Sequence, residues 1–256
     1  MAAVVPGERH CLRRDFVSRR VLIVATVLAC AGFAAAVAAT RASAGSSTPT
    51  KVESVFPAAG SLLVHSVRVL AQPAPGAKLV KVMHDFRPDF RPQVMYAIGE
   101  RTGADGNPWY HISIPMRPNG TYGWVPASTV SLAPTKGQVK VSLGRRTIDL
   151  YWKGRHVWQG KVAIGAPGRE TPVGKYFVAA RFVPYHDPFL GVFAVETSAY
   201  SKLTEWPGGG VVGIHGTSLP QLLGQAVSHG CVRVANSTAV RLKRYAPLGT
   251  PISITK

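Results

Sequence analysis

Short runs of apolar residues, many alternating with polar ones, recur along the chain from about residue 61 onwards. Runs at residues 67–70, 79–83, 94–98 and 109–114 are separated by stretches rich in Pro, Gly, Asn and Asp. These lengths and this alternation are typical of β-strands joined by turns rather than of helices. Residues 61–133 are therefore expected to form a small β domain.

The same pattern resumes after a second turn-rich segment. Three further strands, separated by turns that contain Gly, are expected at residues 138–143, 147–152 and 156–164. Helical signal is confined to two short segments, residues 218–224 and 237–245, and Ser237 or Asn236 is expected to cap the second. The pattern predicts a second β-rich domain with short helices over residues 137–256.

The first 44 residues differ from the rest of the chain. Two Arg pairs precede a mostly apolar segment at residues 21–40. A basic start followed by an apolar run is typical of an export signal, and the small residues at 42–44 suit cleavage. The segment is also long enough to act as an uncleaved membrane anchor, so both interpretations stay open, as do general and twin-arginine export. Residues 45–60 are expected to be a linker.

The chain is strongly basic, with 30 Lys and Arg residues against 12 Asp and Glu residues and a net charge of +18. Such a charge fits nucleic acid, an anionic membrane surface or an anionic polymer outside the cell. An export signal argues against nucleic acid and limits membrane contact to the N-terminal segment. Residues 137–256 hold 15 of the basic residues against five acidic ones, so the excess charge lies mainly in the second domain.

Cysteine usage points to one thiol. Cys11 and Cys30 lie in the export segment, which leaves Cys231 as the one cysteine of the mature chain. A thiol near its ordinary pKa of ~8.5 is mostly protonated at neutral pH, so a catalytic cysteine needs a base or positive surroundings. His215, which follows an apolar run, is the better base candidate. His229 would share a face with Cys231 in an extended backbone.

Two neighbours of Cys231 could assist it. Gly230 lets the backbone approach a substrate closely, and the Gly230 and Cys231 amides could face a developing oxyanion. Arg233, on the same side of a strand as the cysteine, would favour the thiolate and could bind a substrate carboxylate. The residues alone leave open a zinc site made of His215, His229 and Cys231, and a purely structural role.

Two strings around this cysteine form a recognisable signature. Residues 214–217 read IHGT and residues 228–233 read SHGCVR. They resemble the active-site signature of the L,D-transpeptidases that remodel bacterial peptidoglycan. The resemblance extends to a T-P-x-G-x-[FY] hairpin at residues 171–176 and to a closing G-T-P-x-x-[IV] strand, and it covers about residues 137–256. Thr238 departs from it, because many members carry Asp there.

Residues 61–133 resemble a bacterial SH3-like barrel, in which a G-x-P-W-Y-x-I strand and a terminal G-W-V strand recur. Trp109 and Trp124 of these strands are expected to be core residues. The barrel carries no convincing catalytic set and is expected to anchor or position the enzyme. The fold class expected for the whole chain is all-β: a small SH3-like barrel followed by a β-sandwich-like catalytic domain at residues 137–256.

The resemblance implies a role for each site residue. Cys231 would attack the carbonyl of the third stem residue, typically meso-diaminopimelate, and release the terminal D-Ala. His215 would take the thiol proton, with its other ring nitrogen oriented by a backbone carbonyl such as that of Gly216. A side-chain amine would then capture the thioacyl enzyme to give a 3→3 cross-link, or water would give L,D-carboxypeptidase activity. Four further residues would shape the pocket, stabilise the oxyanion and bind the substrate carboxylate: Ser228, His229, Gly230 and Arg233.

The resemblance implies neither a cofactor nor a metal. The expected partners are peptidoglycan stem peptides and anionic cell-wall polymers, and the expected location is the cell wall or the outer face of the membrane. Carbapenems are expected to acylate Cys231. A non-catalytic wall-binding protein and a zinc amidase or endopeptidase are the alternatives.

Overall fold

The computed structural model describes residues 55–185, 187–205 and 207–256. The chain divides into two compact units, Met1–Thr50 and Lys51–Lys256, and every described residue belongs to the second. The predicted signal or anchor at residues 1–44 therefore lies outside the described residues, as does most of the predicted linker. Within the described ranges, no helix is both long and apolar enough to cross a membrane.

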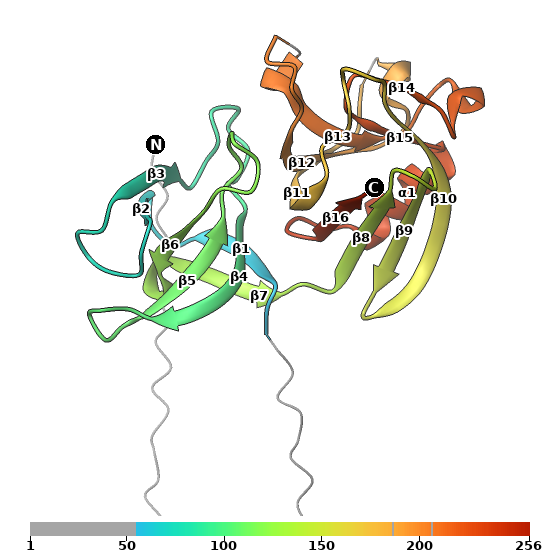
Figure 1. The fold of residues 1–256 in the computed structure, drawn as a ribbon. Helices are drawn as coiled ribbons and strands as arrows, with labels where there is room; N and C mark the ends of the chain where they lie inside the picture. The colour runs from blue at the N-terminus through green and yellow to red at the C-terminus, as the bar shows by residue number, and fades with distance from the viewer. Residues whose placement is uncertain (1–54, 186, 206) are drawn as a thin grey trace, which may run out of the picture. The chain divides into compact units, whose positions relative to one another are not determined.

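Seven strands form the first sheet, in the order β3-β2-β6-β5-β4-β1-β7 (Figure 1). Turn residues separate the strands as the sequence predicts, but the first strand begins at Ala58, inside the range assigned to the linker. The strands are β1 Ala58–Leu62, β2 Ser66–Leu70, β3 Leu79–His84, β4 Met95–Thr102, β5 Pro108–Ser113, β6 Tyr122–Pro126 and β7 Val130–Pro134. The SH3-like assignment of this sheet stays a prediction.

Alternation along these strands places one set of side chains in a core that includes Val69, Met95, Ile112 and Val125. Trp109 is 2% exposed, and its indole Nε1 donates a hydrogen bond to Asp105 at 3.0 Å. The expectation that Trp124 is also a core residue is wrong. Trp124 is partly exposed and its ring stacks on His111, because it lies on the other face of β6 from buried Val125.

Nine strands form the second sheet, in the order β14-β10-β15-β13-β12-β11-β16-β8-β9, and β9 also pairs with β10. That last pairing joins eight of the strands into a closed ring, with β14 added beside β10. The strands are β8 Gly137–Ser142, β9 Thr147–Trp152, β10 Arg155–Gly165, β11 Gly174–Phe182, β12 Ala194–Tyr200, β13 Val211–His215, β14 Ala226–Ser228, β15 Val232–Val234 and β16 Pro251–Thr255.

Ring closure depends on the length of β10. Its first half pairs with β9 up to Lys161, and its second half pairs with β15 at Val162 and Ala163. One long strand therefore turns the corner between two parts of the sheet, which is how strands join the layers of a sandwich or close a barrel. The all-β fold class expected from the sequence is confirmed.

Helical structure is sparse. The predicted helix at residues 218–224 is only a 3-10 turn, Pro220–Leu222, whereas the second predicted helix is α1, Asn236–Tyr245. Ala235 is the N-cap of α1 and makes no side-chain cap, so the predicted capping by Ser237 or Asn236 is wrong. The Asn236 side chain instead accepts the backbone amides of Val192 and Thr217, as described below.

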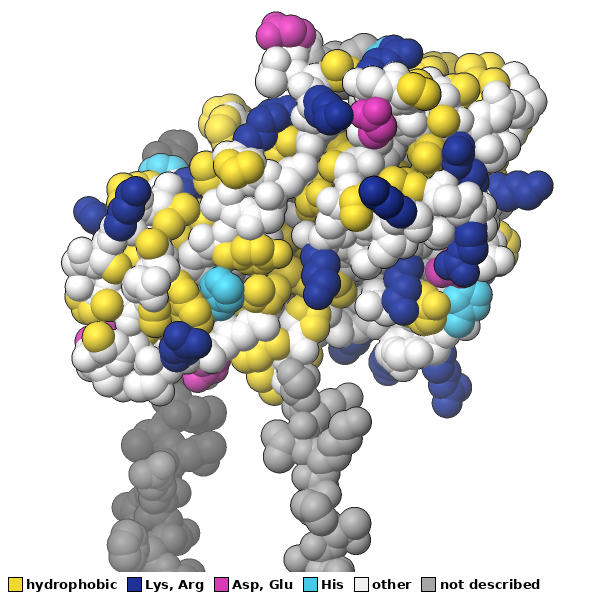
Figure 2. Space-filling view, viewed as in Figure 1, with side chains coloured by type: hydrophobic (Ala, Val, Ile, Leu, Met, Phe, Trp, Pro, Cys, Tyr) yellow, Lys and Arg dark blue, Asp and Glu magenta, His cyan; other side chains and the backbone are white. Residues whose placement is uncertain are grey.

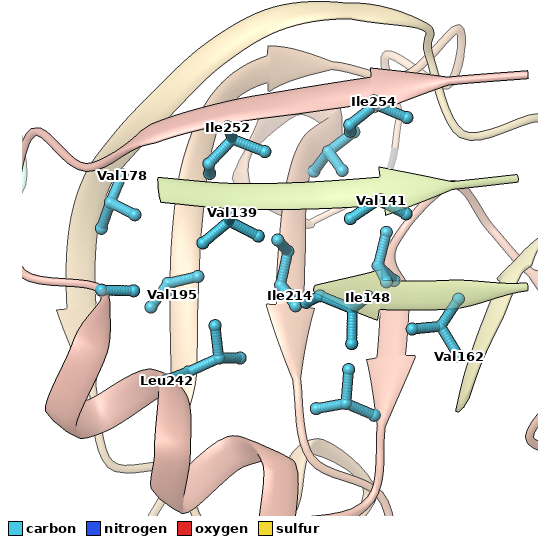
Figure 3. Packing of buried hydrophobic residues seen from close by; sticks show 14 of the residues in the cluster. Val139, Val141, Ile148, Val162, Val178, Val195, Ile214, Leu242, Ile252 and Ile254 are labelled. Atoms are coloured by element: carbon cyan, nitrogen blue, oxygen red, sulfur yellow. The ribbon is translucent and has the colours of Figure 1, made fainter. Parts of the chain in front are cut away.

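Aliphatic side chains fill the ring. Figure 3 shows residues of β8, β9 and β16, such as Val139, Ile148 and Ile252, facing Ile214 of β13 and Leu242 of α1. Each of these five side chains is at most 1% exposed. Burial of branched aliphatic side chains at about 25 cal/mol per Å² stabilises the ring and gives a rigid support for loops at the ends of β13 and β15.

A smaller cluster joins the two sheets. Tyr96 of β4 stacks on Phe177 of β11 with ring centroids 4.8 Å apart, beside Val94 and Ala179. Burial raises the pKa of Tyr96 to about 12, so its hydroxyl stays neutral at physiological pH. The two sheets of the second unit thus share a packed, uncharged contact.

Candidate active site

Two neighbouring parallel strands bring the predicted catalytic residues together. Ile214 of β13 pairs with Val232 of β15, and His215 pairs with Arg233. Cys231 directly precedes β15, and its Sγ accepts a hydrogen bond from the Gly213 backbone amide at 3.4 Å. Because Ile214 and Val232 are fully buried in the ring, the two strand ends that carry the thiol and the imidazole are held rigidly.

His215 is 3% exposed, and one ring nitrogen has a defined partner. Its Nδ1 lies 2.7 Å from the Gly216 carbonyl oxygen. Because a carbonyl only accepts, Nδ1 must carry a proton, which leaves the lone pair of the neutral ring on Nε2. This is the contact that the resemblance implies for these two residues, and the role of His215 as a base stays a prediction.

Charge states at the site follow from burial. Burial lowers the pKa of His215 below its ordinary value, and the Arg233 cation lowers it further, against opposing effects of the Gly216 carbonyl and Asp187. Burial also raises the pKa of the Cys231 thiol, and this outweighs the Gly213 amide and Arg233, which lower it. Arg233 thus favours the thiolate, as the sequence predicts, but its effect is smaller than that of desolvation, and the net shift of the Cys231 pKa is upward.

A tight turn positions the cysteine. Ser228, which is 1% exposed, donates its hydroxyl to the Cys231 carbonyl at 2.6 Å and accepts the Gly230 amide at 3.2 Å. Gly230 has a φ of 115°, and a Cβ there would lie 2.9 Å from the Cβ of Ser201. The Gly230 amide is thus occupied by Ser228, and of the two amides predicted to face an oxyanion only that of Cys231 stays a candidate.

The other supporting residues surround this turn. The ring Nε2 of His229 contacts the Arg169 guanidinium, and burial together with the Arg169 and Arg233 cations lowers the pKa of His229. The guanidinium of Arg233, which is 7% exposed overall, lies 4.4 Å from the ring centroid of Phe189. Sequence reasoning missed both Arg169 and Phe189, because neither belongs to a motif.

Two pockets meet at the thiol. One has a volume of about 320 Å³ and the other about 200 Å³, and both are lined by Leu190, His215 and Cys231. The smaller pocket is also lined by three residues predicted from the sequence, Ser228, His229 and Arg233, and by Asp187 and Phe189 of a loop. The thiol can thus be approached from two directions, which suits a group that reacts with two substrates in turn.

Asn236 connects the loops beside His215. Its Oδ1 accepts the backbone amides of Val192 at 3.2 Å and Thr217 at 3.3 Å. A Cβ on Gly216 would lie 2.2 Å from this oxygen, so the close approach requires glycine there. The H-G-T string therefore places a residue without a Cβ and a backbone amide donor against one asparagine, directly after His215 in the sequence.

The zinc alternative has no support in the geometry. Among the described residues, no group of three or more His, Cys, Asp and Glu side chains is arranged to hold a metal ion. His215, His229 and Cys231 therefore do not form the three-ligand set that this alternative requires.

Comparison with known proteins places this domain in a class. Residues 136–254 match the YkuD family, described as an L,D-transpeptidase catalytic domain. This segment of the chain is therefore similar to an L,D-transpeptidase catalytic domain, in agreement with the signature around Cys231.

Individual relatives cover the same segment. YkuD of Bacillus licheniformis is 34% identical over 118 residues, which is 46% of this chain and 65% of that protein. YkuD of Bacillus subtilis is 30% identical over 118 residues, with the same two coverages. The chain thus spans somewhat less than two thirds of the length of these relatives.

Solved structures of L,D-transpeptidases align with more of the chain. One from Mycobacterium tuberculosis H37Rv covers 77% of this chain and 98% of its own, with 16% identity and a TM-score of 0.42. The Enterococcus faecium L,D-transpeptidase C442S mutant covers 51% of this chain and 54% of its own, with 21% identity and a TM-score of 0.39.

Proposed function

We propose that this protein is a peptidoglycan L,D-transpeptidase in which Cys231 is the nucleophile and His215 the general base. The observation that carries the proposal is the placement of both residues at the ends of paired strands in a domain that matches the YkuD family, where they line two pockets. The acidity of the two groups supports it, because a neutral imidazole and a neutral thiol are the correct starting states for base-assisted attack.

The first half-reaction transfers an acyl group to the thiol. The Nε2 lone pair of His215 takes the thiol proton while Sγ of Cys231 attacks the carbonyl carbon of the third stem residue. The Cys231 amide is the candidate donor to the resulting oxyanion. When the intermediate collapses, the carbonyl carbon loses its bond to the nitrogen of D-Ala, and that nitrogen takes the proton from His215. The product is a thioester, and free D-Ala leaves.

The second half-reaction regenerates the thiol. An amine of a second stem peptide attacks the thioester carbonyl and gives its proton to His215. The C–N bond forms, the C–S bond breaks, and the leaving sulfur recovers the proton. Water in place of the amine would give L,D-carboxypeptidase activity. The two pockets that share His215 and Cys231 support successive donor and acceptor binding, and one acyl intermediate predicts ping-pong kinetics.

A muropeptide assay tests this proposal. The full mature chain is expected to form 3→3 dimers from purified tetrapeptide muropeptides, and Cys231→Ala is expected to form none. If Cys231→Ala still produced dimers, the nucleophile assignment would be wrong. If the wild-type protein made no dimers and released no D-Ala, and iodoacetamide left Cys231 unlabelled, a non-catalytic wall-binding role would replace the proposal.

The proposed partners are stem peptides and, for retention, anionic polymers of the cell wall, to which the predicted export signal would deliver the chain. Lys and Arg side chains are spread over the visible surface with few acidic ones among them (Figure 2). Such a surface supports non-specific attraction to phosphate and carboxylate polymers. Binding to isolated walls is expected to weaken as salt rises, and binding that resists salt would refute retention by charge.

A further inference from the structure

A loop of the first sheet reaches the catalytic pocket. Residues 85–94 join β3 to β4, and within this loop the Arg87 amide donates to the Arg91 carbonyl at 2.8 Å. Phe86 and Pro92 form an isolated β-bridge that closes the loop. Arg87, Asp89 and Arg91 of this closed loop all line the 320 Å³ pocket that contains Cys231.

The loop is tied to the catalytic domain through one carboxylate. Arg87 Nη2 donates to Oε2 of Glu196 at 2.8 Å, and Arg91 Nη2 donates to Oε1 at 2.7 Å. Glu196 lies on β12 directly opposite Gly213, whose amide contacts the Cys231 sulfur. We call Arg87, Asp89, Arg91 and Glu196 the charged cluster. Only strand β13 separates Glu196 of this cluster from the Cys231 thiol.

The cluster contains equal numbers of cations and anions. Asp89 accepts Nε and Nη2 of Arg91 at 3.0 and 2.6 Å, and it lies 3.1 Å from Nη2 of Arg87. A guanidinium has five N–H donors and a carboxylate about four acceptor sites, so these bonds leave donors and acceptors for a ligand. A pocket wall with two cations and two anions suits a ligand group that carries one charge of each sign.

We propose that Arg87, Asp89, Arg91 and Glu196 recognise the zwitterionic end of a diamino-dicarboxylic acid side chain at the third position of the donor peptide. The arginines bind its carboxylate, and Asp89 with Glu196 accepts hydrogen bonds from its ammonium group. This inference rests on the proposed function, because it takes the donor stem peptide as the occupant of the pocket. It assigns substrate specificity to a loop outside the catalytic domain.

A lysine at the third position has the ammonium group but lacks the carboxylate, so it leaves the two arginines without a ligand. Charge-assisted bonds from guanidinium to carboxylate are among the stronger polar contacts in proteins. The expected preference for the diamino-dicarboxylic donor over the lysine donor is at least about tenfold in Kd.

Peptide binding to the Cys231→Ala protein tests the inference without turnover. Two tetrapeptides that differ only at the third residue, meso-diaminopimelate or L-lysine, are titrated by calorimetry. The test variant adds Arg87→Gln, Asp89→Asn, Arg91→Gln and Glu196→Gln, which removes all four charges so that no carboxylate of the cluster is left without its arginine partner. Its selectivity is expected to fall to about one, because this wall of the pocket then offers no charged group to the side chain of either peptide. Thermal unfolding confirms that the variant is folded.

Arg117→Gln is the matched control. Arg117 also joins the two sheets, donating to the Ser201 carbonyl at 2.9 Å, but it does not line this pocket. The control is expected to keep the full selectivity of the Cys231→Ala protein. The inference would be overturned if the test variant kept the selectivity of the Cys231→Ala protein. It would also be overturned if the Cys231→Ala protein bound both peptides equally or bound neither.

Two further peptides identify which carboxylate is bound. Amidation of the side-chain carboxylate is expected to abolish the preference, whereas amidation of the terminal carboxylate is expected to preserve it. The reverse result would overturn the assignment to the side chain. Since these titrations need no acyl transfer, a protein that shows the preference but makes no dimers would refute the proposed function and leave this recognition site standing.

Discussion

Replacement of Ser228 by alanine tests whether the turn before Cys231 positions the thiol. The serine hydroxyl satisfies two buried backbone groups at once, the Cys231 carbonyl at 2.6 Å and the Gly230 amide at 3.2 Å. Alanine keeps the volume of the site nearly unchanged and removes both bonds. The turn that presents the thiol would then lose its internal tie without any change to Cys231 or His215.

The magnitude follows from the two unsatisfied groups. A buried polar group left without its partner costs about 1–3 kcal/mol, and partial relaxation of the turn makes about 2–4 kcal/mol the expected total for Ser228→Ala. In a protein of this size each kcal/mol lowers Tm by about 2–4 °C, so a fall of roughly 4–16 °C is expected. Ser142→Ala is the matched control, because Ser142 is 7% exposed and accepts one backbone amide, that of Arg145. Its expected cost is about 1 kcal/mol.

Two rates separate positioning from stability. Release of D-Ala from a donor tetrapeptide needs the aligned site and is expected to slow at least about tenfold in Ser228→Ala, at a temperature where the variant is folded. Alkylation of Cys231 by iodoacetamide needs access and a thiolate but no aligned substrate, and is expected to change less than about threefold. Ser142→Ala should change neither rate, and Ser228→Thr, which keeps the hydroxyl, should recover most of the donor activity. Unchanged D-Ala release in Ser228→Ala would refute the reasoning.

Three further outcomes follow. Because burial lowers the pKa of His215, the unfolded chain binds the extra proton first, so folding stability should fall as pH drops below ~6.5, and His215→Gln should flatten this fall in urea titrations. A pH dependence unchanged by that substitution would contradict the assignment. Gly216→Ala places a Cβ 2.2 Å from Oδ1 of Asn236 and should cost about 1–3 kcal/mol in calorimetry, whereas Gly99→Ala, with nothing within 4 Å, should cost less than about 0.5 kcal/mol; equal costs would refute the close approach. A carbapenem should add its mass to the wild-type protein and not to Cys231→Ala; a wild-type protein of unchanged mass would contradict that expectation.

Local patterns predicted the strands well where both signals, alternation and turns, coincide. The run at 147–152 becomes β9 with those bounds, since Gly-containing turns flank it and its apolar positions face the core. The two strings H-G-T and S-H-G-C come from adjacent strands, and residues of both line one pocket, whereas the catalytic roles assigned to them stay predictions. These features depend on neighbours close in the sequence or on a signature that spans the whole domain.

Contacts between distant segments were beyond the sequence. Arg87 and Glu196 are 109 residues apart, and nothing in the composition of either segment marks the other as its partner. Asn236 was expected to cap a helix, which is the usual use of asparagine at that position, yet its side chain bonds two loop amides instead. A polar residue near a helix start has several available donors, and only the packed structure decides among them.

Burial raises the pKa of the Cys231 thiol, which affects how readily this cysteine is oxidised. The sequence suggested a thiolate favoured by Arg233, but burial keeps the thiol protonated and the His215 ring neutral. Oxidation and disulfide exchange proceed through the thiolate, so a protonated thiol reacts slowly with oxidants. If the predicted export segment is removed, Cys231 is the one remaining cysteine, and we expect it to oxidise slowly in an oxidising compartment. In the proposed function it loses its proton to His215 as the sulfur attacks a carbonyl carbon. The same burial thus protects the thiol from oxidants and keeps it in the protonated state from which acyl transfer starts. A substitution that exposes Cys231 to water should increase its oxidation by peroxide and slow acyl transfer.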